Sequence, residues 1–168
     1  MTPARLVPRG PAVPTAATVG LFVPLAAIDR HLQATGGPGI IPFELAGSVG
    51  SDAIFARWGE AGRPWAIASL VLDFPFLAAY TTLNLIVVER LRQRAASHGH
   101  RLLALLARPV AALQIVAGAS DAIENAALFV VVARRGDPDR AALARRAART
   151  KVAALGVGWA YAATLLRP

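Results

Sequence analysis

Polar side chains lie inside two long apolar stretches of this sequence, where carboxylates and amides are unexpected. The stretch that ends near Val88 contains Asp73, Tyr80 and Asn84. A second set, between Val110 and Arg134, comprises Gln114, Asp121, Glu124 and Asn125. Desolvation raises the pKa of a carboxyl in such surroundings, which suits it to hold a charge or to transfer a proton. Neighbouring phenol and amide groups would orient a bound molecule.

The spacing within each set predicts that its members share one face of a helix. Asp73, Tyr80 and Asn84 are separated by seven and four residues, which puts them within about 20° of one line along a helix. The second set repeats this spacing, with Glu124 beside its last member. Because polar stripes in a bilayer turn toward protein, we expect the two stripes to face each other.

The rest of the composition indicates what holds these helices. The chain has 168 residues, of which 55% are hydrophobic, and its mean hydropathy is +0.49. A soluble chain this short cannot bury so much apolar surface, and the apolar residues fall into four blocks. The sequence therefore predicts one all-α domain, a polytopic membrane four-helix bundle over residues 1–168. The predicted spans are residues 15–32, 64–88, 110–133 and 150–166.

The segments between the spans carry their own signals. Residues 1–14 are rich in proline and predict an irregular tail before an uncleaved first helix. The segment 41–58 mixes apolar and polar residues, and it is too polar to span and too periodic for a plain loop. This favours a short amphipathic helix at the membrane interface, with Trp58 at headgroup depth. Residues 89–101 are expected to form a basic connection, and Gly156 would offer a flat surface for close helix packing.

Helix geometry also predicts the depth of the polar residues. At about 1.5 Å per residue, Asp73 and Glu124 lie at similar levels in antiparallel spans. Asp29, Glu44 and Lys151 belong to the same side of the predicted bundle and form a second tier of candidates. Carboxylates gathered in one half of the bundle would line a cavity that opens toward that side.

The charge of the chain predicts its partners. The formal net charge is +8, and all of the basic residues except Lys151 are arginine. Since these residues flank apolar segments, contact with lipid is expected and nucleic acid is not. The expected contacts with anionic headgroups involve Arg140, Arg145, Arg146 and Arg149. Abundant Ala and Arg are typical of GC-rich bacterial genes, so we expect a multi-pass protein of the bacterial plasma membrane.

Other kinds of site find little support in the sequence. The chain has no cysteine, which excludes disulfides and thiolate ligands. His98 and His100 lie in a polar loop without companions, and such pairs are usually solvated, so no metal or cofactor is expected. Basic residues occur in similar numbers on the two sides of the predicted spans, which leaves the membrane orientation open. The oligomeric state is also open.

Three segments resemble recurring motifs of an uncharacterised family of small bacterial four-helix integral membrane proteins. They are PFELAGS at 42–48, LDFPFLAAYTTL at 72–83 and AGASDAIENAALF at 117–129. The resemblance covers roughly residues 15–166, and it implies a fold and candidate positions without an activity. A weaker likeness, in architecture alone, is to the emopamil-binding and sigma-2 receptor superfamily. Those proteins are also four-helix bundles, with intramembrane acids around a sterol-sized cavity.

The polar stripes fit several functions. The first is a site that binds a small apolar, cationic or lipid-like ligand, with or without proton-transfer chemistry, so catalysis is left open. The second is a proton or cation pathway, and the third is a structural or assembly subunit of a membrane complex. Hydrogen bonds that hold antiparallel helices together would also use Asp and Asn. Against that last role, an Asp at the bilayer centre costs about 2.5–3.5 kcal/mol.

Overall fold

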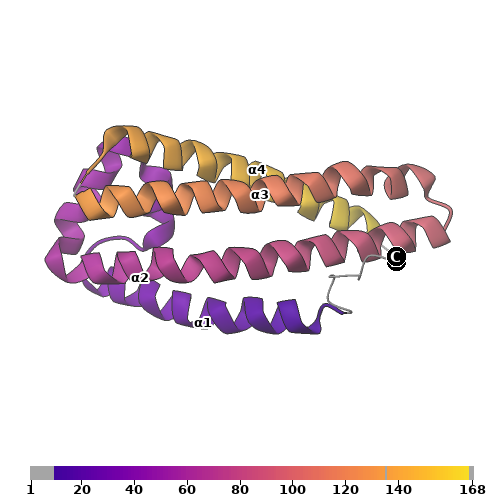
Figure 1. Ribbon diagram of the computed structural model, residues 1–168, viewed down its shortest axis with the longest axis horizontal. Helices are drawn as coiled ribbons and strands as arrows, with labels where there is room; N and C mark the ends of the chain where they lie inside the picture. Colours follow the sequence, from indigo (N-terminus) through magenta and orange to yellow (C-terminus); the bar gives the residue numbers. More distant parts are fainter. Residues whose placement is uncertain (1–9, 135, 167–168) are drawn as a thin grey trace, which may run out of the picture.

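The computed structural model describes residues 10–134 and 136–166, which form helices joined by short turns (Figure 1). The helices are α1 (Ala12–Ala34), α2 (Ile40–Ser97), α3 (Arg101–Arg134) and α4 (Pro138–Leu166). The predicted all-α class is therefore confirmed. Of the predicted N-terminal tail, residues 1–9 lie outside the described residues, and α1 begins earlier in the chain than expected.

Within the residues that the structure describes, three helices are long and apolar enough to cross a membrane. They are α1, the part of α2 from Gly50 to Ser97, and α3. The fourth predicted span, 150–166, lies in α4, which is not among them. The reason is its composition, because α4 begins with an Arg-rich stretch and carries Lys151. The residues between Lys151 and Leu166 are fewer than the about 20 that a spanning helix needs.

The helices run lengthwise beside one another, with α1 along one edge of α2 (Figure 1). Helix α2 packs against all three other helices, and α3 also packs against α4. Two apolar clusters occupy opposite ends of the bundle. One contains Leu70, Leu128 and Trp58, and the other contains Val88 and Val110. Both polar stripes lie between these clusters along the chain, so apolar packing on either side fixes them.

The first part of α2 differs from the predicted interfacial helix. Residues 41–58 are helical, but Gly47 and Gly59 break the regular geometry, with φ values of 71° and 58°. These left-handed conformations favour glycine, which has no Cβ to clash with the backbone. Trp58 is only 2% exposed and packs against Phe43, while its indole N–H donates to the Pro38 carbonyl at 2.7 Å. Trp58 therefore packs inside the protein, and its depth at the headgroups stays a prediction.

The hairpin between α2 and α3 is tighter than the sequence suggested. Helix α2 continues to Ser97 and α3 starts at Arg101, so the predicted basic connection over 89–101 is largely helical. Glu89 and Arg92, one turn apart, form an ion pair at 2.7 Å on the surface of this extension. Pro109 lies inside α3 and does not begin it. Both helices thus extend beyond their most apolar segments.

Candidate functional site

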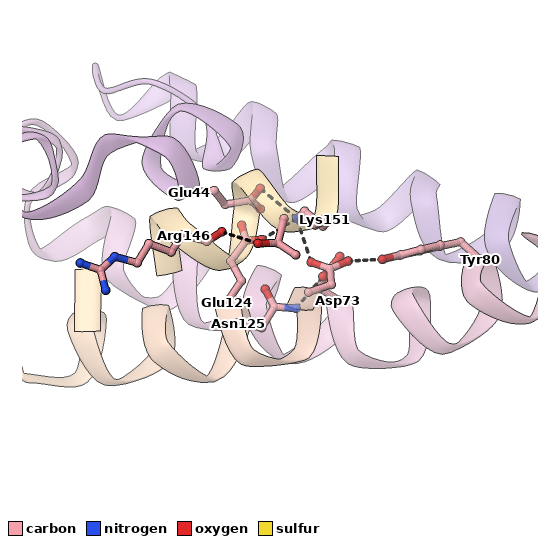
Figure 2. A network of polar contacts seen from close by, with 9 residues as sticks. Glu44, Asp73, Tyr80, Glu124, Asn125, Arg146 and Lys151 are labelled. Carbon is pink, nitrogen blue, oxygen red and sulfur yellow. Dashed lines mark hydrogen bonds and ion pairs between the residues drawn. The ribbon is translucent and has the colours of Figure 1, made fainter. Parts of the chain in front are cut away.

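Polar side chains from α2, α3 and α4 gather in the middle of the bundle, and we call them the carboxylate cluster (Figure 2). Its members are Glu44, Asp73, Tyr80, Asp121, Glu124, Asn125 and Lys151. The cluster forms because α3 packs against both α2 and α4, which brings the stripes of α2 and α3 together with one residue of α4. The predicted meeting of Asp73 with the stripe of α3 is part of this arrangement.

Lys151 is the cation at the centre of the cluster. Its Nζ lies 2.8 Å from Asp121 Oδ1 and 2.8 Å from Glu124 Oε2. A third carboxylate oxygen, Oε2 of Glu44, lies 3.5 Å from the same nitrogen. The Lys151 side chain is only 14% exposed. A buried charge of this kind is stable only with close partners of opposite sign, and these acids provide them.

Glu124 is the most deeply buried acid of the cluster, with no exposed surface. Among the described residues, neither of its carboxylate oxygens has a well-aligned hydrogen-bond donor, although the Lys151 ammonium is close to one of them. Glu44 lies next to Glu124, outside the three helices that are long enough to span. Burial raises the pKa of the Glu44 carboxyl above its ordinary value, and the Lys151 ammonium opposes this effect. Burial therefore favours a proton on Glu44.

The two aspartates of the cluster, Asp73 and Asp121, each accept a hydrogen bond from a neutral donor. The Tyr80 hydroxyl donates to Asp121 Oδ2 at 2.7 Å, so Asp121 is bound by Tyr80 and Lys151 together. The Asn125 amide donates to Asp73 Oδ2 at 2.6 Å. Among the ion pairs of the described residues, none includes Asp73. Asp73 is thus the acid of the cluster that has an amide, and not an ammonium, as its partner.

Asn84 and Gln114 form a separate contact, outside the carboxylate cluster. The Asn84 amide donates to Gln114 Oε1 at 3.2 Å, and Gln114 Nε2 donates to the Ala154 carbonyl at 3.2 Å. Gln114 therefore links α2, α3 and α4. A Cβ added at Gly158 would lie 2.5 Å from Gln114 Nε2, while Gly156 has no such neighbour. Close packing of α4 thus depends on Gly158, and the prediction for Gly156 is wrong.

Asp29 serves mainly as a cap for the next helix. Its Oδ1 accepts a hydrogen bond from the Ile40 backbone N–H at 2.6 Å, and its Oδ2 accepts one from Gln33 at 2.6 Å. The first bond satisfies one of the free N–H groups at the start of α2. It also fixes the turn at residues 35–39, in which Gly36 has a φ of 94°.

A cavity of about 740 Å³ adjoins the cluster. Its polar wall includes Glu44, Asp73, Tyr80, Asp121 and Lys151. Its apolar wall comes from α1, α2 and α4 and includes Phe22, Leu25, Phe76, Leu155 and Trp159. Asn84, Asn125 and Asp29 also line it, whereas Gln114 and Glu124 do not. Among the described side chains, no group of three or more His, Asp or Glu residues could hold a metal ion.

The structure brings most of the predicted residues together but changes their ranking. Glu44 and Lys151, which the sequence placed in a second tier, are central to the cluster, whereas Gln114 lies outside the cavity. The signal that could have raised Lys151 is compositional, because it is the only lysine among 18 basic residues. An ammonium is more compact than a guanidinium and fits between several carboxylates.

Comparison with known proteins adds no name to this arrangement. No protein-family model matches the chain, and neither a curated protein nor a solved structure is detectably similar to it. The two resemblances drawn from the sequence motifs and the architecture therefore stay predictions.

Proposed function

We propose that this chain is an integral membrane protein, a four-helix bundle whose internal cavity binds a small amphipathic molecule with a cationic head. The single observation that carries the proposal is the cavity itself. Its lining combines carboxylates with aliphatic and aromatic side chains. A pocket that is mostly apolar, with a few converging polar groups, is the usual form of a small-molecule site.

The charge balance of the cluster favours a cation over an anion. Lys151 is already neutralised by Asp121 and Glu124, at 2.8 Å each. Asp73 lines the cavity, and within the described part of the chain its hydrogen-bond partner is the Asn125 amide. A carboxylate in a partly dry site gains most from an ammonium group at hydrogen-bonding distance. An anionic head would instead meet the Asp73 carboxylate and be repelled by it.

A series of single-chain probes that differ only in the head group tests this proposal. Dodecylamine should raise the melting temperature of the protein in lipid nanodiscs, whereas dodecanol and dodecanoate should not. Asp73→Asn should weaken dodecylamine binding about 10- to 100-fold, because a hydrogen bond to a charged group contributes about 1.5–3 kcal/mol. Asp139→Asn is the matched control, since Asp139 is an exposed acid in the first turn of α4. Equal responses to all three probes would refute a cation site.

A proton pathway is the second candidate, and one observation favours it. Hydrogen bonds and ion pairs connect Tyr80 through Asp121 to Lys151 and on to Glu44 without a gap longer than 3.5 Å. Such a chain is a plausible relay for protons. Proteoliposomes that acidify in response to an imposed potential, with loss of the flux in Asp121→Asn and no response to dodecylamine, would favour this function over ligand binding.

The Arg-rich surface of α4 is proposed to bind anionic lipid. Four arginines are exposed there, while Ala141, Ala144 and Ala148 on the opposite face are buried. The arginines are Arg140, Arg145, Arg146 and Arg149. Replacing the last three with Gln should weaken retention of anionic lipid, at about 1 kcal/mol for each basic residue. Native mass spectrometry after purification measures this retention, and zwitterionic lipid is the control. If the triple variant retained as much anionic lipid as the wild type, the assignment would be contradicted.

A further inference from the structure

In the described part of the chain, two of the helices that line the cavity, α1 and α4, make no backbone contact with each other. Helix α1 contributes Phe22 and Leu25 to its lining, and α4 contributes Leu155 and Trp159. Within residues 10–134 and 136–166, however, α1 makes backbone contacts with α2 alone, and α4 packs against α2 and α3. The cavity therefore lies over the polar stripe of α2, with α1 on one side and α4 on the other, and a gap remains between those two helices.

The side chains at this gap are apolar and uncovered. Phe22 of α1 is 59% exposed, and Val152 and Trp159 of α4 are 58% and 68% exposed, although all three line the cavity. Large apolar groups beside a cavity mouth are unfavourable in water and favourable in hydrocarbon. Since α1, on one side of this gap, is long and apolar enough to span a membrane, lipid acyl chains would reach the exposed apolar side chains at the gap.

The two ends of the cavity differ. At one end, the segment that carries Glu44 is held by the bond from Ile40 N–H to Asp29, and the exposed side chains of Arg30, Gln33 and Ile41 also line the cavity there. At the other end, the hydrogen bonds of Gln114 join α2, α3 and α4. The apolar mouth lined by Phe22, Val152 and Trp159, between α1 and α4, is therefore one approach to Asp73.

We propose that the cavity opens sideways into the membrane between α1 and α4 and takes a single-chain amine amphiphile from the lipid phase. The ammonium head lies at Asp73, and the alkyl tail passes Phe22 and Trp159 and remains among the acyl chains. This inference rests on the proposed function for the identity of the head group. It adds the route of entry from the lipid phase and the requirement for an alkyl tail. A site entered from water would require neither.

Closing the gap with a reversible cross-link tests the route. The chain has no cysteine, so the double variant Phe22→Cys with Trp159→Cys carries the only thiols. Bifunctional thiol reagents of graded length, cleavable by reductant, would join α1 to α4 in nanodiscs. When radiolabelled dodecylamine is added after cross-linking, the amount bound should fall to that of the Asp73→Asn variant. Cleavage of the cross-link by reductant should restore binding. Dodecylamine added before cross-linking should stay bound through exchange into fresh nanodiscs.

A second cysteine pair provides the matched control. Val116 and Val157 are 42% and 44% exposed and line a separate depression between α3 and α4. Cross-linking Val116→Cys to Val157→Cys should leave dodecylamine binding unchanged. Full binding after complete cross-linking of the first pair would overturn the lateral route and leave the cation site standing. If the wild-type protein and the uncross-linked first pair both fail to bind dodecylamine, the proposed function is overturned as well.

Discussion

Replacing Lys151 with methionine is expected to lower the free energy of unfolding by about 3–5 kcal/mol, since it removes one partner of a buried ion pair. Methionine fills a similar volume but leaves Asp121 and Glu124 without the ammonium that lies 2.8 Å from each. Glu124 suffers most, because it has no exposed surface and no aligned donor. Chemical denaturation in detergent, followed by circular dichroism, measures the loss.

A double variant separates charge from packing in this prediction. Adding Glu124→Gln to Lys151→Met removes a negative charge along with the positive one and should recover part of the lost stability. Arg in place of Lys151 keeps the charge but brings a larger planar group, so its cost should fall between wild type and methionine. If Lys151→Met alone were as stable as wild type, Lys151 would not be the centre of the cluster.

The second large effect is expected at Asp121, where leucine should cost about 1–3 kcal/mol more stability than asparagine. Asparagine is similar in size and still accepts the hydrogen bond from Tyr80, which is 2.7 Å long in the wild type. Leucine leaves the Tyr80 hydroxyl and one side of Lys151 without a partner. Thermal melts of the two variants beside wild type give the difference.

Tyr80→Phe provides the control for the Asp121 variants. If the Tyr80 hydrogen bond accounts for part of the extra cost of leucine, Asp121→Leu should cost less in the Tyr80→Phe background than in wild type. If Asp121→Leu were as stable as Asp121→Asn in either background, the polar groups would only fill space.

Much of the site follows from helix periodicity in the sequence. The spacing of seven and four puts Asp73 and Tyr80 on one face of α2, and the structure pairs that face with Asn125 and Asp121 of α3. Apolar runs with buried acids in their middle also predicted the all-helical class. These features are local, because residues a few positions apart on a helix have fixed relative directions.

The features that the sequence did not predict depend on contacts between distant segments. Lys151 meets Glu44 across 107 residues of chain, and no periodicity relates the two positions. Gly47 breaks the start of α2 with a positive φ, although glycine also occurs in regular helices of this chain such as α3. Trp58 is buried because the turn at Pro38 folds back onto it. In each case tertiary packing decides between outcomes that the local sequence allows.

The most direct test of an amphiphile site is an experimental structure of the protein in a lipid nanodisc with dodecylamine added. The account predicts density that starts at Asp73, with the amine nitrogen about 2.7–2.9 Å from a carboxylate oxygen, and that leads out between α1 and α4. The Lys151 contacts with Asp121 and Glu124 should be unchanged in that structure. A cavity filled by the protein's own side chains, with α1 packed against α4 and dodecylamine absent, would contradict the account.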